Sequence, residues 1–256
     1  MLSSLETLFL KFQSPRSHPG GLWSSQPPKH IILPALRRFE FKGVTEYLEE
    51  LVNRIPQLNN MKITFFNQID FNTPRLAQFI NCTPTLRVPN EVRVHVVVPE
   101  IASIGFRYWA SENSFGYLSI SISCGEADWQ LSSIEQVCNS LHSLSTVENL
   151  NLYIKGGPGY PLPAWEDDPI ENTLWLQLLL PFTGVKNLSL SVELAPGIAA
   201  TLKGLVTSRV TEILPSLQNI FVQGLDRSGP LRENIEQFVA ARQLSDNPIA
   251  IFDWNT

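Results

Sequence analysis

Histidine is the residue type in this chain best suited to metal binding or proton transfer. The chain holds four: His18, His30, His95 and His142. No two of them are three or four residues apart, so no helix can present a pair of them to one metal ion. His95 alternates with Val94 and Val96 in the manner of a strand. We therefore expect it to face away from the core, where it could contact a ligand.

Carboxylates gather at two places. Glu166, Asp167 and Asp168 follow a tryptophan in a polar stretch, and Glu126 and Asp128 form a second group. Two carboxylates perform acid–base chemistry on a sugar only within a substrate cleft that gives them different environments. The sequence indicates no such cleft, so we interpret both groups as solvated acidic loops.

The glycine-rich segment at residues 156–159 has the composition of a phosphate-binding loop but lacks its lysine, and Pro158 removes an amide donor. We expect a surface loop over residues 155–170.

The chain has three cysteines, Cys82, Cys124 and Cys138. They are far apart and form no Cys-x-x-Cys pair, so neither a zinc knuckle nor a redox motif is present. The sequence thus predicts no catalytic residues, no metal site and no cofactor.

The overall composition also limits the possible partners. The chain has 256 residues, a net charge of −5 and 17% charged residues. A weakly acidic chain has no electrostatic reason to bind nucleic acid or anionic lipid. Residues 1–12 do not resemble a secretory signal, and no apolar run is long enough for a membrane span. We expect an intracellular protein, cytoplasmic or nuclear, that binds neither nucleic acid nor membrane.

The elements that would position a site are indicated by a recurring pattern. Four apolar residues, spaced by three, three and two positions, recur with the last two alternating as in a strand. The matches begin at Leu2, Leu33, Ile55, Leu144, Phe182 and Leu214. Alternating stretches at 92–96, 118–122 and 249–251 add further strands. The mean separation is about 30 residues, slightly longer than regular leucine-rich repeats.

Helical signals lie between these strands, at residues 44–55, 73–80, 132–144, 198–213 and from Pro230 onwards. Thr73 is predicted to cap a helix whose first position is Pro74. Ser132 and Glu135 have the spacing of a capping box.

These elements predict an α/β fold, a leucine-rich-repeat-like solenoid over residues 1–256. Stacked units would share a curved parallel sheet on the concave side, with helices on the convex side. The competing arrangement is a doubly wound sheet with helices on both faces. Residues 98–130 hold several aromatic side chains and no clear helix, and are either a strand-rich repeat or an insertion.

The chain also resembles a known family at its C-terminal end. The segment 238–245 reads Phe-Val-Ala-Ala-Arg-Gln-Leu-Ser and precedes Pro248, a short strand and Trp254. A recurrent entry to a strand is formed by Leu33-Pro34-Ala35-Leu36, Ile55-Pro56-Gln57-Leu58 and Leu214-Pro215-Ser216-Leu217. These features resemble fungal F-box-like repeat proteins. The resemblance implies repeats that present a substrate, and a ubiquitin-ligase adaptor as partner only if an F-box lies upstream, since this chain begins within a repeat.

The leading hypothesis is a non-enzymatic protein-binding repeat domain, similar to the substrate-recognition part of an F-box protein. The alternatives are an enzyme with an unrecognised site in residues 98–170 and a purely structural scaffold. Binding to a protein partner is predicted on the concave strand face, at positions that alternate with buried ones. These positions are Glu40, Lys62, Arg93, His95, Asn151, Tyr153, Ser189 and Phe221.

Overall fold

The structure is a computed structural model. It describes residues 4–12, 33–52, 55, 58, 60–66, 73–86, 88–97, 101–111, 114–123, 127–154, 169–205, 210–225 and 229–254.

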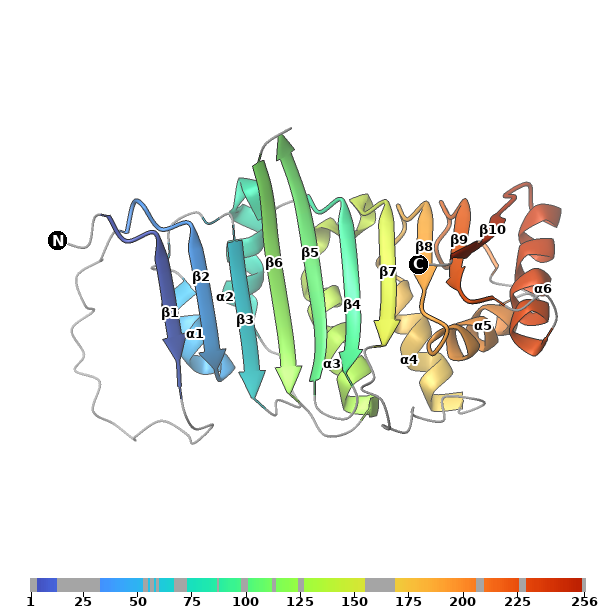
Figure 1. Ribbon diagram of the computed structural model, residues 1–256, viewed down its shortest axis with the longest axis horizontal. Coiled ribbons are helices and arrows are strands. Elements are labelled where there is room, and N and C mark those ends of the chain that lie inside the picture. Colours follow the sequence, from blue (N-terminus) through green and yellow to red (C-terminus); the bar gives the residue numbers. More distant parts are fainter. Residues whose placement is uncertain are drawn as a thin grey trace.

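Strands and helices alternate along most of the chain (Figure 1). The strands are β1 (Thr7–Lys11), β2 (Arg38–Gly43), β3 (Asn60–Phe66), β4 (Glu91–Val97), β5 (Ile101–Ser111), β6 (Ser114–Ser123), β7 (Asn149–Ile154), β8 (Asn187–Leu190), β9 (Asn219–Gln223) and β10 (Ala250–Trp254). The α-helices are α1 (Thr45–Leu51), α2 (Pro74–Cys82), α3 (Ala127–Ser140), α4 (Pro169–Leu179), α5 (Ala195–Gly204) and α6 (Pro230–Leu244). Short 3₁₀ helices, η2 (Pro84–Leu86) and η3 (His142–Thr146), precede β4 and β7.

All ten strands form one open sheet in the order β1-β2-β3-β6-β5-β4-β7-β8-β9-β10. Every neighbouring pair is parallel except the two pairs made by β5, which runs antiparallel to β4 and to β6. The strands β4, β5 and β6 therefore form an antiparallel meander, whose outer strands join β3 and β7 in parallel.

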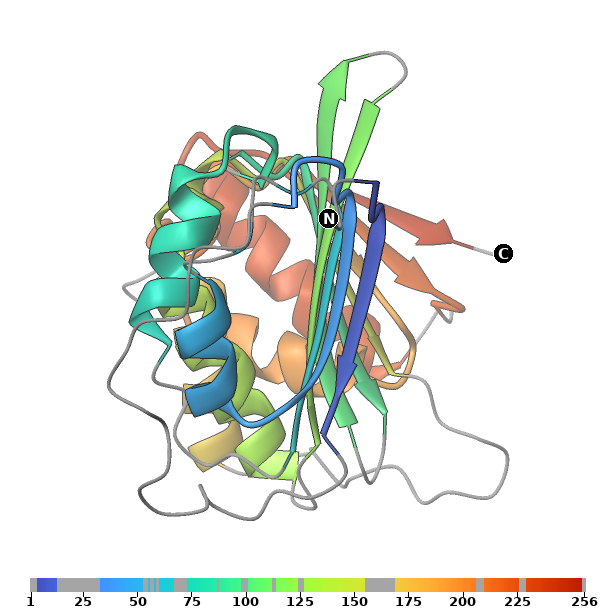
Figure 2. The ribbon, with the colours of Figure 1, turned by 90° about the vertical axis from the view of Figure 1, so that its left-hand side faces the viewer.

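The described helices all lie on one face of this sheet, and none of them lies on the other face (Figure 2). Strand residues alternate between the two faces, and those facing the helices are almost all apolar and buried. In β3, for example, Met61, Ile63 and Phe65 are buried. The buried residues form a core cluster that runs from Leu36 to Ile249.

The recurring apolar pattern has a common local structure. Its first two positions form a tight turn, in which the amide of the second donates to the carbonyl oxygen of the first. The distances are 3.2 Å from Val147 to Leu144, 3.3 Å from Val185 to Phe182 and 3.0 Å from Leu217 to Leu214. The last two positions are buried in the strand that follows, except in β1, where Leu8 and Leu10 are partly buried. The mixed α/β prediction and the strand positions of these repeats are confirmed.

The prediction of a wholly parallel sheet is wrong at residues 98–130, because β5 was not predicted and is antiparallel. Strands β5 and β6 also lie between β3 and β4, which are consecutive in sequence, because β3 pairs with β6 and not with β4. Alternation of apolar and polar residues is the same in parallel and antiparallel strands, so the pattern alone could not give the direction.

The predicted cap of α2 is also wrong in its chemistry. The helix begins at Pro74 as expected, but the Thr73 side chain makes no capping hydrogen bond. The carboxylate of Glu49, on α1, instead accepts the amide N–H groups of Arg75 and Leu76, each at 2.9 Å. A carboxylate at a helix N-terminus satisfies donors that have no partner within the helix. This contact ties two successive helices together.

Three other helix predictions need correction. Helix α3 begins at Ala127, so Ser132 and Glu135 lie inside it and form no capping box; the Glu135 carboxylate accepts from Asn139 at 2.6 Å. Helix α5 ends at Gly204, well before residue 213. Helix α4 was not predicted, and it takes in the last two residues of the loop expected over 155–170.

Several features singled out in the sequence lie outside the described residues. They include the glycine-rich segment 156–159, the acidic residues 166–168, Glu126 and Cys124. Of the other cysteines, Cys138 is buried and Cys82 is exposed. Burial raises the pKa of the Cys138 thiol far above its usual value, and nearby Glu135 acts in the same direction.

Among the described helices, none combines the length and apolar character needed to cross a membrane.

Candidate functional site

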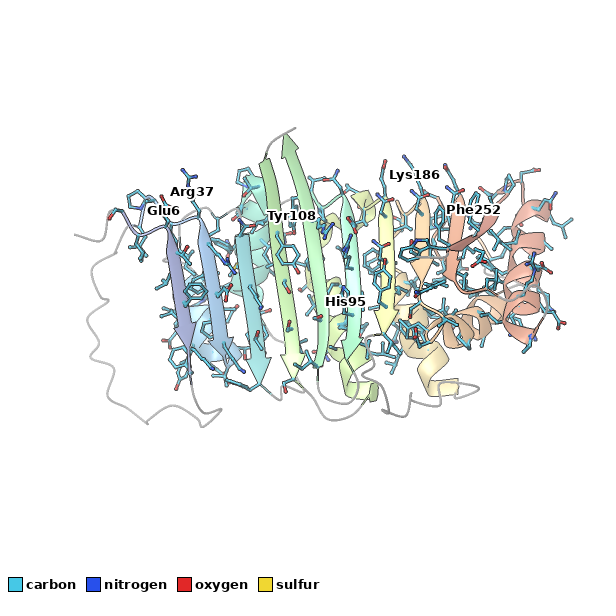
Figure 3. All side chains as sticks on the ribbon, viewed as in Figure 1. Glu6, Arg37, His95, Tyr108, Lys186 and Phe252 are labelled. Atoms are coloured by element: carbon cyan, nitrogen blue, oxygen red, sulfur yellow. The ribbon has the colours of Figure 1, made fainter. Side chains whose placement is uncertain are left out.

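The candidate site is the open face, which we define as the strand residues that alternate with the buried ones. All eight residues predicted to bind a partner lie on it. Phe9, Tyr117 and Phe252 also lie there, and their exposed fractions are 59%, 41% and 45%. Figure 3 shows His95 near the middle of the sheet and Phe252 near its C-terminal end.

Six of the eight predicted residues belong to one row across the sheet. The register places them in line with residues of the other strands. The row runs Phe9, Glu40, Lys62, Ser119, Gly105, Arg93, Asn151, Ser189, Phe221 and Phe252. Glu40 and Lys62 are direct neighbours, but Lys62 and Arg93 are separated by β6 and β5. The open face therefore has a central part that the repeats alone do not supply.

The other two predicted residues, His95 and Tyr153, are paired across β4 and β7, with ring centroids 5.4 Å apart. Trp254 at the end of β10 reaches Tyr153, with centroids 6.1 Å apart. Partial burial raises the pKa of the Tyr153 phenol, and Arg93 and Arg107 oppose this rise. The phenol is therefore neutral at physiological pH. Aromatic side chains thus lie among asparagine and serine side chains on the C-terminal half of the open face.

A central hollow of about 510 Å³ lies on the open face over the meander. Its lining includes Arg93 and His95 from β4, Ser103, Gly105 and Arg107 from β5, and Gly116, Tyr117 and Ser119 from β6. The hollow exists because serine and glycine form its floor between longer side chains. A Cβ on Gly105 would lie 3.2 Å from the Tyr117 hydroxyl oxygen, so glycine allows Tyr117 to lie close to the sheet.

The carboxylate of Glu91 contacts both arginines of the central hollow. Glu91 accepts from Nε of Arg93, lies 3.6 Å from a terminal nitrogen of Arg107, and accepts from Nδ2 of Asn151 at 2.9 Å. The Glu91 side chain is only 15% exposed, whereas those of Arg93 and Arg107 are 35% and 45% exposed. Two guanidinium groups thus share one carboxylate, and the cluster carries a net positive charge.

A second hollow, of about 440 Å³, lies on the open face over β1 to β3; we call it the N-terminal hollow. Its polar lining comprises Lys11, Glu40, Lys42, Lys62, Thr64 and Ser121. Three ammonium groups therefore surround one carboxylate, and Glu40 is itself paired with Arg38. Lys42 lies over the Phe66 ring, 5.1 Å from its centroid.

Asparagines form a ladder at the start of the C-terminal strands. Asn187 donates to Oδ1 of Asn149 at 2.8 Å, and Asn219 donates to Oδ1 of Asn187 at 2.7 Å. Each asparagine directly precedes the first buried residue of its strand. The ladder joins β7, β8 and β9 by side-chain hydrogen bonds in addition to the backbone pairing.

We predict that Asn187→Ala lowers the free energy of unfolding by about 2 kcal/mol, because two side-chain hydrogen bonds are lost at about 1 kcal/mol each. Ser189→Ala, two residues along the same strand and on the same face, should change it by less than about 0.5 kcal/mol. Urea unfolding followed by circular dichroism measures both. Equal stability of the two variants would contradict a stabilising role for the ladder.

Sequence reasoning missed several open-face residues. Arg107 and Ser103 were missed with β5 itself. Tyr117 and Ser119 flank Leu118 in a strand that was predicted, so alternation could have identified them. The asparagine ladder also had a signal, since asparagine occupies the same place before Met61, Leu150, Leu188 and Ile220.

Comparison with protein-family models, with curated proteins and with solved structures found no match. Within the described part of the chain, no group of three or more histidine, cysteine, aspartate or glutamate residues is arranged to hold a metal ion. The resemblance to F-box-like repeat proteins stays a prediction.

Proposed function

We propose that the chain is a leucine-rich-repeat-like solenoid, interrupted by the β4–β6 meander, and that its open face binds a protein partner without catalysing a reaction. The observation that carries this proposal is the open face itself, which spans ten strands and lies opposite all the described helices. A sheet face in register over that width offers a broad, rigid surface. Broad surfaces with aromatic and arginine side chains are typical of protein interfaces.

The repeated turns and the asparagine ladder support the solenoid proposal, because they show structurally equivalent positions in successive units. Under this proposal the domain corresponds to the substrate-recognition part of an F-box protein of the cytoplasm or nucleus. A link to ubiquitin ligase would further require an F-box module that binds the ligase adaptor.

The competing hypotheses receive less support from the arrangement. An enzyme site in residues 98–170 would benefit from a carboxylate available to act as acid or base. Among the described residues, the carboxylate that contacts the arginines of the central hollow is that of Glu91, and it is engaged by Arg93 and Asn151. A purely structural scaffold gives no reason for exposed aromatic side chains such as Phe9 and Phe252.

The test is site-specific crosslinking followed by affinity measurement. A photoreactive amino acid is placed at Tyr153 or Phe221 on the open face and, in a matched control, at Arg232 or Glu236 on α6. We expect partners to crosslink from the open face and not from the helix. The affinity of a purified partner should fall at least tenfold in a variant with His95, Tyr153 and Phe221 replaced by alanine. It should not change when Arg232 and Glu236 are replaced.

Crosslinking from the α6 positions alone would overturn the proposal. So would a purified partner that binds the triple variant with unchanged affinity. Circular dichroism and thermal unfolding establish that each variant is folded before binding is measured.

A further inference from the structure

The open face of the N-terminal and central strands carries a charge opposite to that of the whole chain. The chain has a net charge of −5. At the outward positions of β1 to β6, the basic side chains outnumber the acidic ones, Glu40 and Glu91. The basic side chains are Lys11, Arg38, Lys42, Lys62, Arg93 and Arg107. A basic face on an acidic protein attracts an anionic group to one side of the molecule.

The central hollow holds its arginines in place. Glu91 binds Nε of Arg93, and Asn151 from the neighbouring strand donates to the same Glu91 oxygen at 2.9 Å. Among the described residues, the terminal nitrogens of Arg93 have no hydrogen-bond partner, and a guanidinium group can bind a carboxylate through two parallel hydrogen bonds. Hydroxyl groups of Tyr117 and Ser119 line the same space and can donate further hydrogen bonds, whereas the Ser103 hydroxyl already donates to the carbonyl oxygen of His95.

The N-terminal hollow provides a second anion position at a defined separation. Strand β6 lines both hollows and contributes Ser119 to the central one and Ser121 to the N-terminal one. The distance from Arg93 on β4 to Lys62 on β3 is three strand spacings, or about 14 Å. The distance from Arg93 to Lys11 on β1 is five strand spacings, or about 24 Å. An extended peptide that advances about 3.3 Å per residue covers these distances in about four to seven residues.

We propose that these two hollows bind one extended acidic segment of the protein partner, which lies across the strands and places a carboxylate in each hollow. This proposal rests on the proposed protein-binding function and specifies the chemistry of the partner. The occupant is a peptide and not a nucleic acid, because Glu40 and Glu91 lie among the basic groups. Isolated carboxylates can avoid those two groups, whereas a continuous phosphate backbone would pass close to both.

The experiment measures fluorescence anisotropy of a labelled eight-residue peptide with two glutamates at each end and a glycine–serine centre. The complete chain should bind this peptide, and binding should weaken as salt is added. The variant Arg93→Gln/Arg107→Gln should lose at least tenfold in affinity. The matched control Arg232→Gln, an exposed arginine on α6 paired with Glu236, should bind as the unaltered chain does.

A second variant, Lys42→Gln/Lys62→Gln, keeps the test decisive if the arginine variant does not fold. It alters the N-terminal hollow, leaves Glu91 paired, and should also weaken binding. A peptide with glutamine in place of glutamate should not bind.

Any one of three results would overturn the inference. The glutamate peptide does not bind, or both hollow variants bind it as tightly as the unaltered chain does. The third is that a single-stranded thymidine oligonucleotide binds more tightly than the peptide. If crosslinking places the natural partner on the open face while the glutamate peptide does not bind, this inference fails and the proposed function stands. Crosslinking only from the α6 positions would overturn both this inference and the proposed function.

Discussion

Replacing Gly184 with alanine is expected to lower the free energy of unfolding by about 3 kcal/mol. Gly184 lies in the turn before β8, where that turn approaches η3 of the preceding repeat. A Cβ at this position would lie 2.1 Å from the carbonyl oxygen of Ser145 and 3.3 Å from that of Val147. Both neighbours are backbone atoms, so no side-chain rotation can relieve the overlap.

The surrounding hydrogen bonds prevent an easy adjustment at Gly184. The amides of Lys186 and Asn187 both donate to the carbonyl oxygen of Glu148, at 2.9 and 3.0 Å. Moving the turn away from Ser145 would therefore strain the pairing of β7 with β8. A loss of about 3 kcal/mol is a large fraction of the 5–15 kcal/mol typical of folded proteins.

Gly204 provides the control for the Gly184 variant. It ends α5, and a Cβ there would meet no atom within 4 Å. Gly204→Ala should leave stability unchanged or raise it by up to about 1 kcal/mol, since alanine restricts the unfolded chain. Urea unfolding of both variants compares them directly. If Gly184→Ala is as stable as Gly204→Ala, the turn before β8 is not in close contact with η3.

The second large effect is expected at Arg242, a fully buried arginine on α6. Its guanidinium group donates to the carbonyl oxygens of Val210 at 3.2 Å, Leu214 at 3.4 Å and Pro215 at 2.9 Å. Burial lowers the pKa of this group from its usual value. Among the described residues it has no carboxylate partner, and the dipoles of these three carbonyl groups stabilise its charge.

We predict that Arg242→Met lowers the free energy of unfolding by about 3 kcal/mol, because three carbonyl groups lose their donor at about 1 kcal/mol each. The turn they belong to is itself unusual, since Leu214 has a φ of 49°. The control is Arg232→Met, an exposed arginine on the same helix whose ion pair with Glu236 contributes less than about 0.5 kcal/mol. If Arg242→Met is as stable as Arg232→Met, the guanidinium does not hold α6 to this turn.

The repeats were predictable because a short local pattern determines them. In Phe182, Val185, Leu188 and Leu190, all four apolar residues are buried, the first two in a turn and the last two in a strand. The helix before them was not predictable in this way. Helix α4 packs against α3 and α5 and buries Trp175, Leu178 and Leu179. Leucine also occupies positions 174 and 176 between its exposed residues Thr173 and Gln177, so the helical period of apolar residues is weak.

The candidate site was predictable strand by strand but not as a surface. Alternation identified Lys62 and Arg93 as outward residues, since each lies between buried neighbours. Their separation depends on strand order, which involves pairing between residues far apart in the sequence. The central hollow could not be inferred without β5, because Ser103, Gly105 and Arg107 supply part of its floor and wall.

The meander has a consequence for the order in which a growing chain can fold. Strand β3 (Asn60–Phe66) pairs with β6 (Ser114–Ser123), so its partner is synthesised some fifty residues later. The hairpins that join β4, β5 and β6 involve neighbouring segments and can form early. Once formed, they present two outer strands that point the same way, and the earlier and later segments can each add to one of them. We therefore expect the most irregular part of the chain to form first and its regular parts to assemble onto it.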